Sequence, residues 1–511
     1  MIVKLKKIID MKKNIMICLT LSIALSQAGC SDFLEPNPRG FYTEENYFTT
    51  EQDAINAVQG IYGKVLDENF AGNDDTKYEG CGDDILAISD HHAWDPPVLY
   101  FTITPGDALL ADRQWPVKYE VISRANLVIM NVPNMSRDQI SEAIQNRCVG
   151  EAYFLRAFTH WWLYLIHGEI PVITDVDVKN NNYNKPKNTI DEVLGQIEYD
   201  LLQAAALLPA TTPAAEGGRV HKGSAWSHLV QLYMHWSCYD GKDAYLDKAI
   251  EAGSHIIGNP DYAMVADFSD CFTLRNGAIN TEVLFQLNGD NGMEYNNNLE
   301  KGYFWELDGW DGWCWYWPTP DLVAAFGTDP RLQKTILRDG DEVRTYNGGS
   351  KTYTVDRSPT GYAFRKNAQY VLTDGGDFRH ELSAVFAIMR SSDVYLLVAE
   401  AKIRKNGTGA GDAEINAVRS RVGATTRTGY TAADLVLERR LELAGENRRF
   451  FDLRRWDRCN HFGGVNIATL LSGDYNGTAR TFQVPKHYFF PIPQNQIDKT
   501  GGVLIQNPAY Q

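Results

Sequence analysis

Apolar residues recur at helical spacing along most of this chain. After the capping-type start Thr50-Glu51-Gln52-Asp53, the repeat continues through Ala54, Ile55, Val58, Ile61, Tyr62 and Val65. The same spacing predicts further helices near residues 117–131, 137–166, 190–208, 222–238, 242–257, 393–405, 411–421 and 432–447. We therefore expect a mainly α-helical fold, with its scaffold mainly in 45–258 and 392–456.

Several of these helices are separated only by short polar or glycine breaks, such as Asp240-Gly241 and Gly407 to Gly409. Small residues stand among large ones, as Ala152 and Ala157 do within the aromatic run 152–158. This pattern lets helix axes approach closely, as in helical-hairpin solenoids. The letters contain no clean 34-residue repeat, so any tetratricopeptide-like character would be structural.

Two stretches interrupt the helical pattern. Residues 67–116 are rich in Gly, Asp and Pro and predict long loops. Residues 260–390 contain strand candidates at Val283 to Leu287 and Thr352 to Val355, with a turn signal at Asn347-Gly348-Gly349. Loops of this length in a folded protein are usually functional, so we expect a loop-rich binding subregion here.

The N-terminus has the composition of a secretion signal. From Met11, two lysines precede the apolar run Ile15 to Leu25, which is too short to cross a bilayer. Small residues then lead to Cys30, as in a bacterial lipoprotein box, although Gln27 stands where an aliphatic residue is usual. We expect a signal peptide at 1–29, a lipidated tether at 30–40 and a single domain at 41–511. The alternative is a soluble secreted protein cleaved nearby.

The net charge and the cysteine spacing argue against nucleic-acid binding and against a zinc or redox site. The chain has 511 residues and a net charge of −16, which repels nucleic acid. Its cysteines show no C-x-x-C or other paired spacing, so a zinc or redox site has no support. Beyond Cys18 and Cys30, we expect buried free thiols with at most one bridge.

The most informative segment is GYFWELDGWDGWCWYWPTPDLVAAF at 302–326. Five of the chain's twelve tryptophans fall within 13 of its residues, at positions 305, 310, 313, 315 and 317. The interleaved glycines disfavour a helix, and so many indoles cannot all pack inward from a loop. Exposed indoles can stack on the apolar face of a sugar ring while nearby carboxylates bind its hydroxyls.

An aromatic core plug is the alternative for this segment. Trp315 and Trp317 precede the apolar helix start at Leu322 and are predicted to pack, whereas Trp310 and Trp313 are predicted to be exposed. The predicted glycan-binding residues are Tyr303, Trp305, Asp308, Trp310, Asp311 and Trp313, together with Trp94 in the first long loop.

Other polar residues give weaker signals. His91 and His92 are adjacent, which suits one metal ion poorly. Asp83-Asp84 allows a sugar hydroxyl or a calcium ion, but two carboxylates alone do not make a motif, and we expect them to be solvated. No cofactor or metal is therefore predicted.

Enzyme motifs are absent from the sequence. It contains no G-x-S-x-G, H-E-x-x-H, phosphate loop or dinucleotide fingerprint. A glycosidase would need two opposed carboxylates, for which Glu306, Asp308 and Asp311 are the candidates. Acidic residues are so numerous here that this coincidence is weak evidence, and we predict no enzyme activity.

Ordered blocks over nearly the whole mature chain resemble the SusD/RagB family of outer-membrane lipoproteins of Bacteroidetes. They are CSDFL (30–34), GEAYFLRAFTHWWLYLIHGEIPVIT (150–174), GRVHKGSAWSHLVQLYMHW (218–236), SDVYLLVAEAKIRKNG (392–407), ERRLELAGENRRFFDLRRW (438–456), FPIPQNQID (490–498) and QNPAY (506–510). Most of these blocks are expected to be scaffold. In 438–456, Arg448, Arg449, Arg454 and Arg455 are predicted to pair with Asp452 and neighbouring acids.

The resemblance implies a helical body of about four tetratricopeptide-like helix pairs and an irregular ligand-binding half. It also implies a lipid-anchored protein at the cell surface that delivers oligosaccharides to a SusC-like TonB-dependent transporter. Alternatives are a peptide- or other nutrient-binding partner of such a transporter, or a glycoside hydrolase.

Overall fold

The helices form where the sequence predicts them, with boundaries set by local capping. The computed structural model describes residues 47–67, 70, 78–87, 95–106, 109–212, 216–272, 280–288, 316–345, 349–354, 358–366, 370–371 and 385–511. Its longer helices are α4 (Glu51–Val65), α7 (Leu109–Asn131), α8 (Glu142–His167), α10 (Ile190–Leu207), α11 (Lys222–Trp236), α12 (Ala244–Ser254), α16 (Ser391–Asn406), α17 (Asp412–Arg421), α18 (Ala432–Glu442) and α19 (Arg449–Arg458). Shorter ones are α6 (Asp95–Leu99), α9 (Asp175–Lys179), α14 (Pro320–Phe326), α15 (Leu332–Thr335), α20 (Ile467–Leu470) and α21 (Gln494–Lys499).

The start of α4 confirms the predicted capping motif. The Asp53 backbone N–H donates to Thr50 Oγ1 at 3.3 Å, and the Thr50 N–H donates to Asp53 Oδ2 at 2.7 Å. Equivalent capping boxes begin α10 at Thr189 and α18 at Thr431. Each box provides acceptors for backbone N–H groups that have no partner within the helix. The start of each of these helices is therefore determined by a few neighbouring residues.

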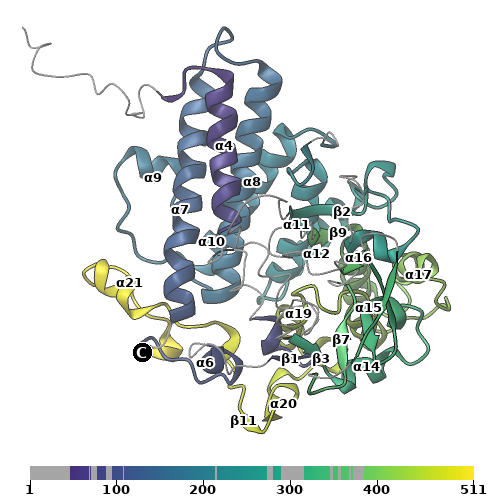
Figure 1. Cartoon of the computed structure of the whole chain (residues 1–511). Coiled ribbons are helices and arrows are strands. Elements are labelled where there is room, and N and C mark those ends of the chain that lie inside the picture. Colours follow the sequence, from purple (N-terminus) through teal and green to yellow (C-terminus); the bar gives the residue numbers. More distant parts are fainter. Residues whose placement is uncertain are drawn as a thin grey trace, which may run out of the picture. The chain divides into compact units, whose positions relative to one another are not determined.

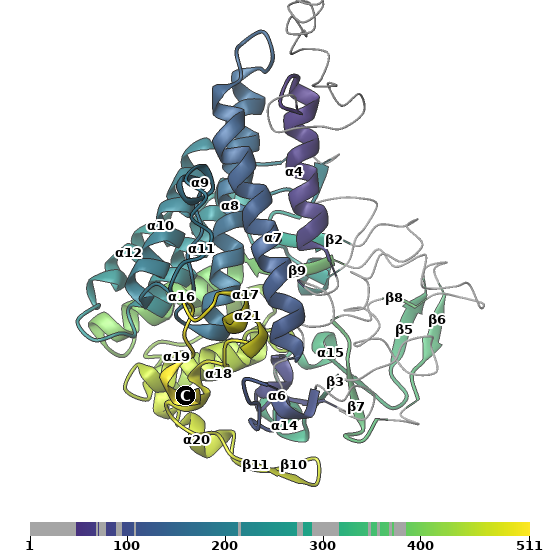
Figure 2. The same cartoon turned by 90° about the vertical axis from the view of Figure 1, so that its left-hand side faces the viewer.

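Successive helices pack against one another in chain order. The row runs from α4 through α7, α8, α10, α11 and α12 to α16, on which α17 and α18 also pack (Figures 1 and 2). Ala152 and Ala157 are fully buried, as their place among large residues predicted. At Gly253 in α12, a Cβ would lie 2.3 Å from Val398 Cγ2 of α16, so this close approach requires glycine. The mainly helical fold is confirmed, whereas its tetratricopeptide-like character remains a prediction.

Several helix boundaries differ from the prediction. Helix α7 begins at Leu109, so the stretch 67–116 is not one long loop, and Pro116 lies inside the helix. Buried residues on both sides of it, Trp115 and Val121 among them, stabilise a helix that proline alone would end. The helix predicted over 432–447 ends at Glu442, and α19 follows after a turn in which Gly445 has a φ of 74°.

The strands are short, and most of them lie between residues 283 and 390. They are β1 (Ile85–Ala87), β2 (Val283–Asn288), β3 (Tyr316–Pro318), β4 (Ile336–Arg338), β5 (Glu342–Thr345), β6 (Ser350–Thr352), β7 (Tyr362–Phe364), β8 (Tyr370–Val371), β9 (Val385–Arg390), β10 (Gly473–Tyr475) and β11 (Thr478–Arg480). Antiparallel pairs form between β1 and β3, β2 and β9, β4 and β7, and β10 and β11. Strand β5 pairs with β6 antiparallel and with β8 parallel, on the other side of the view in Figure 2 from α10 and α12.

The strand predicted at Val283 to Leu287 is confirmed as β2, but the one predicted at Thr352 to Val355 is wrong. Strand β6 ends at Thr352, and Tyr353 instead bonds through its backbone to Gly340 and Asp341 while its side chain is buried. The β5–β6 pair flanks the predicted turn at Asn347-Gly348-Gly349, of which the first two residues lie outside the described ranges.

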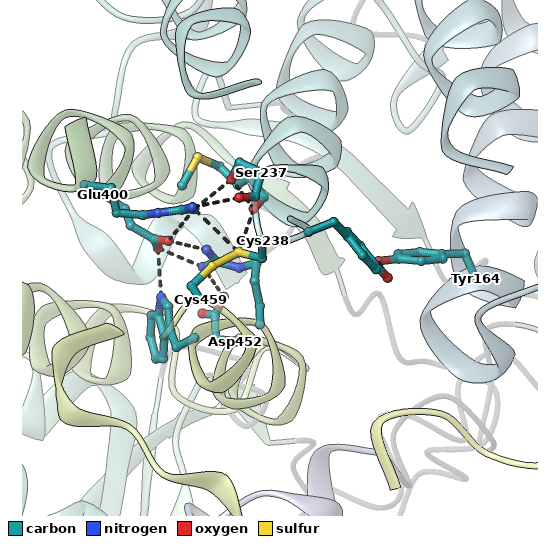
Figure 3. Close-up of a disulfide and its surroundings, with 11 residues drawn as sticks. Tyr164, Ser237, Cys238, Glu400, Asp452 and Cys459 are labelled. Carbon is teal, nitrogen blue, oxygen red and sulfur yellow. Dashed lines mark hydrogen bonds and ion pairs between the residues drawn. A yellow bond between two sulfur atoms is a disulfide. The ribbon is translucent and has the colours of Figure 1, made fainter. Parts of the chain in front are cut away.

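One disulfide joins the ends of two distant helices. Cys238, after α11, is bonded to Cys459, after α19, while Cys81, Cys148 and Cys271 are buried thiols. Beside the bridge, the Arg404 guanidinium donates to the Ser237 carbonyl at 2.9 Å, and Glu400 accepts from Arg455 and from the indole N–H of Trp456 (Figure 3). The expected combination of buried thiols with at most one bridge is thus confirmed for these five cysteines.

Residues Thr50 to Gln511 cluster as one unit by their contacts. Cys30, the signal peptide predicted at 1–29 and the tether predicted at 30–40 lie outside the described residues. Within the part of the chain that the structure covers, no helix combines the length and apolar character that crossing a membrane requires.

Candidate functional site

The predicted glycan-binding residues belong to two segments that the structure does not describe. Trp94 lies in 88–94, and Tyr303, Trp305, Asp308, Trp310, Asp311 and Trp313 lie in 289–315. Described residues bound each segment. These end residues are Ala87 and Asp95 for the first segment, and Asn288 and Tyr316 for the second.

A two-stranded ladder brings these ends together. Strand β1 pairs antiparallel with β3, in the register Ile85↔Pro318, Leu86↔Trp317 and Ala87↔Tyr316 (Figure 1). The chain leaves β1 at Ala87 and enters β3 at Tyr316, which are opposite each other at the same end of the ladder. The first segment therefore begins, and the second segment, about 200 residues later in the sequence, ends, at residues that pair with each other.

The other end of the second segment is anchored in the same way. Asn288, the last residue of β2, pairs with Val385, the first residue of β9. Strand β9 leads directly into α16, so this anchor belongs to the helical scaffold. We call the two paired ends, Ala87–Tyr316 and Asn288–Val385, the loop roots.

The first loop root, Ala87–Tyr316, is part of a buried apolar cluster. Ile85, Ala87, Tyr316, Leu322 and Phe326 belong to one buried cluster that extends to α18. Trp317 is 4% exposed, so the prediction that it packs is confirmed, and Tyr316 is equally buried. Trp315 lies outside the described residues.

Tyr475 ties the end of β1 to the β10–β11 hairpin. Its hydroxyl accepts from the Ala87 backbone N–H at 2.9 Å and donates to the Gly80 carbonyl at 3.1 Å. The Arg480 guanidinium lies 4.3 Å from the Tyr475 ring centroid and donates to the Gly82 carbonyl. Burial raises the pKa of Tyr475 above its ordinary range, so the hydroxyl remains protonated and available as a donor.

Asp83 and Asp84, predicted to be solvated, are instead paired with arginines, with Asp84 buried and Asp83 partly buried. Arg449 binds both oxygens of Asp83, at 2.7 and 2.8 Å, and the Arg440 Nε donates to Asp84 Oδ1 at 2.6 Å. Burial alone would raise the pKa of Asp83, but the guanidinium groups of Arg449 and Arg440 and a backbone hydrogen bond together lower it. Burial dominates at Asp84 and raises its pKa to about 6.

These ion pairs explain what part of the 438–456 block does. Arg440 in α18 and Arg449 in α19 fix the chain directly before β1, and the Asp84 carbonyl accepts from the Thr319 N–H directly after β3. Arg455 pairs with Asp452, as expected, whereas Arg448 pairs with Asp393 of α16. Arg454 differs, since it donates to the Tyr488 carbonyl at 2.6 Å and lies over the rings of Phe451 and Phe489.

Possible metal ligands in the described part of the chain are not grouped. Among the described residues, no three His, Cys, Asp or Glu side chains are grouped so that they could hold a metal ion. Asp83 and Asp84, the residues that allowed calcium, already bind arginines. His91 and His92 lie outside the described residues.

Sequence reasoning missed the residues that build the loop roots. A three-residue strand such as β1 has too few alternations to be recognised by its pattern. The pairing of Asp83 with Arg449 spans 366 positions, and no local spacing signals it. The one available signal was the high number of arginines in 438–456. Arginines that become buried need acidic partners, and some of these partners must come from other parts of the chain.

Comparison with known proteins fits this architecture. Residues 281–510 match the family model described as "SusD family", and residues 45–234 match the model "Starch-binding associating with outer membrane". SusD-like protein P2 of Formosa agariphila is 26% identical, with 96% of this chain and 98% of that protein covered. A SusD-like protein of Bacteroides ovatus is 24% identical, with coverages of 98% and 92%.

Solved structures show the same fold. A SusD-like protein of Bacteroides fragilis superposes with a TM-score of 0.75 at 19% identity, covering 94% of this chain and 99% of that one. A "Laminarin binding SusD-like protein" gives 0.72 at 24% identity, with coverages of 91% and 100%. Surface glycan-binding protein A of Bacteroides thetaiotaomicron, in complex with laminarihexaose, gives 0.71 at 20% identity, with coverages of 90% and 100%.

The fold defines a class of mainly helical proteins with a few short strands. Together, the two family models match most of the described chain, and they cover nearly all of the sequence blocks that carry the resemblance. The chain belongs to the SusD/RagB family.

Proposed function

We propose that this protein is a cell-surface lipoprotein that binds oligosaccharides and delivers them, chemically unchanged, to a SusC-like TonB-dependent transporter. The observation that carries the proposal is the pairing of Ala87 with Tyr316, which places the ends of the two tryptophan-bearing segments side by side. Aromatic residues from both segments can then contribute to one binding surface. The family relation supports the same function, since relatives of this fold are described as binding laminarin and laminarihexaose.

The binding surface is proposed to consist of Trp94, Trp310 and Trp313, with Tyr303, Trp305, Asp308 and Asp311 as further contacts. Each stacked indole would contribute about 1–2 kcal/mol, and the acidic side chains would select sugars through their hydroxyls. A net charge of −16 favours neutral glycans over sulfated ones. Weak affinity, micromolar to millimolar, suits a protein that must release its ligand to a transporter.

Binding of neutral oligosaccharides to the purified protein tests this function. Affinity gels and calorimetry with laminarin oligosaccharides, xylogluco-oligosaccharides and other neutral glycans should identify at least one ligand. The double substitution Trp310→Ala/Trp313→Ala should abolish that binding. Tyr183→Ala is the matched control, because Tyr183 is an aromatic residue 54% exposed on the α9–α10 connection. Binding of peptides but of no glycan would contradict the proposal, as would hydrolysis of the ligand.

Anchoring and delivery have their own tests. Labelling cells with a tagged fatty acid should modify the wild-type protein and leave Cys30→Ser unlabelled. Affinity purification of the tagged protein from its native membrane should recover a TonB-dependent barrel. Recovery of the unmodified protein alone would contradict both parts.

A further inference from the structure

A pocket of about 510 Å³ opens beside the Cys238–Cys459 disulfide, and none of its lining residues belongs to the loop roots. Its lining comes from the α11–α12 connection, from the end of α19 with the segment that follows, and from Val484 and Tyr488, before and within the short helix η9 (Lys486–Tyr488). All of these lie in the described part of the chain. The volume falls within the range of small-molecule sites, about 300–1,000 Å³.

Covalent and hydrogen bonds fix the walls of this pocket. The disulfide holds the end of α11 against the end of α19 (Figure 3). The Tyr239 and Tyr164 hydroxyls are 3.0 Å apart, and the Tyr488 hydroxyl donates to Asp457 Oδ2 at 2.5 Å. A pocket with fixed walls loses little entropy when a ligand enters it.

The buried acid in the pocket already binds protein donors. Asp457 Oδ1 accepts from the Ile467 backbone N–H at 2.9 Å and faces His461 Nδ1 at 3.0 Å. Because that nitrogen also faces the Val465 carbonyl at 2.9 Å, it lies between two acceptors and must carry the hydrogen. With Oδ2 taken by Tyr488, Asp457 has little capacity left for a ligand.

The pocket also contains a guanidinium group that is not paired with an acid of the described chain. The Arg458 guanidinium lies 4.0 Å from the Tyr239 ring centroid and 5.4 Å from that of Tyr488, and no acid of the described chain lies within ion-pair distance of it. Arg455, three residues earlier, is paired with both Glu400 and Asp452. Asn466 adds amide donors, because its carbonyl oxygen already accepts from the Thr469 N–H at 2.9 Å.

We propose that this pocket is a second ligand site, which binds a sugar carrying a carboxylate, that is, a uronic acid unit. A planar guanidinium stacked on aromatic rings is suited to bind a carboxylate through two parallel hydrogen bonds. The exposed Asp240 can accept from sugar hydroxyls, and Val484, 47% exposed, offers an apolar contact for the ring. The choice of a sugar as the body of the ligand rests on the proposed function, whereas the carboxylate follows from Arg458 alone.

Ligand-observed NMR titration of the purified chain with glucuronate and with glucose tests this site. The two sugars share the ring and differ in carboxylate against hydroxymethyl. Glucuronate should bind at least tenfold more tightly than glucose, and Arg458→Gln should remove that difference. Arg458→Lys keeps the charge but loses the paired hydrogen bonds, so it should show an intermediate affinity.

Control variants separate this site from folding and from the proposed neutral-glycan site. Arg427 also stacks on a tyrosine, Tyr430, but pairs with Asp434, so Arg427→Gln should leave glucuronate binding unchanged. Trp310→Ala/Trp313→Ala should also keep glucuronate binding while losing neutral glycans. Equal affinities for the two sugars would overturn the inference. So would an Arg458→Gln protein that melts like the wild type and binds glucuronate unchanged, or glucuronate binding that is lost only in the tryptophan variant. The difference between the two sugars that depends on Arg458 does not require a neutral-glycan site at the tryptophans, so the two proposals can fail separately.

Discussion

Asp83 and Asp84 show how identical neighbouring side chains acquire different properties. Both are carboxylates directly before β1, yet Arg449 lowers the pKa of one and burial raises that of the other. Two adjacent buried carboxylates repel each other when both are ionised, and this favours a proton on the less well paired one. Asp84 therefore makes the loop root sensitive to pH.

Replacing Asp84 by Asn should flatten the pH dependence of stability. The native pKa of about 6 lies above the ordinary value of 3.8, so Asp84 stabilises the fold below pH 3.8 and loses that contribution as pH rises through 6. The wild type should lose on the order of 1–3 kcal/mol from this group between pH 4 and pH 7. Urea unfolding at both pH values should show a smaller loss in Asp84→Asn. An identical loss in the two proteins would rule out this origin.

Tyr475→Phe should destabilise the protein by about 1–3 kcal/mol, because it leaves the buried N–H of Ala87 without its acceptor. Chemical unfolding measures the change. Tyr183→Phe, at an exposed position, serves as the control and should stay within about 0.5 kcal/mol of the wild type. Equal stability of the two variants would contradict the role given to Tyr475.

At the level of elements, β1 and β3 owe their position to packing more than to strand propensity. Each has three residues, too few to be stable alone. Side chains of α18, α19 and β11 fix the residues directly before β1, and β3 pairs with β1. Strand β2, at six residues, is long enough to appear in the sequence pattern. The loop roots are therefore a tertiary property, assembled from parts that are hundreds of residues apart.

Trp317→Ala should cost about 3–5 kcal/mol, since the indole is buried and its removal leaves a cavity. Trp310→Ala should change the unfolding free energy by less than 1 kcal/mol if that indole is exposed, as proposed. Denaturant titration of both variants gives the comparison. A large loss of stability in Trp310→Ala would place that residue in the core and remove it from the binding surface.

The Cys238–Cys459 bridge links α11 to α19 across 221 positions. Closing so long a loop in the unfolded chain should stabilise the fold by up to about 5 kcal/mol. The double variant Cys238→Ser/Cys459→Ser should unfold at lower denaturant concentration than the oxidised wild type, and the reduced wild type should match it. Identical midpoints for oxidised and reduced protein would show that the bridge contributes nothing.

Across the whole molecule, the sequence was most informative where structure is local. The capping start at Thr50, the breaks at Asp240-Gly241 and Gly407, and the burial of Trp317 follow from neighbouring residues and were predicted correctly. The Asp83–Arg449 pair, the register of Ala87 with Tyr316 and the choice of Cys459 as partner of Cys238 depend on contacts between distant segments. A single sequence carries no pattern that specifies such contacts.

The same limit explains what remains a prediction at the binding surface. Trp94 and Trp310 were selected because glycine- and proline-rich surroundings favour loops, a local argument. Whether they face one ligand depends on how the two segments approach each other. The pairing of Ala87 with Tyr316 supports a shared surface by bringing one end of each segment together.

Calorimetric titration of one neutral oligosaccharide into the wild type, Trp94→Ala and Trp310→Ala tests that shared surface directly. Our account predicts one bound oligosaccharide per chain and a loss of about 5- to 30-fold in affinity for each variant, with the stoichiometry unchanged. An affinity that depends on one tryptophan and not on the other, or two independent binding events, would contradict it.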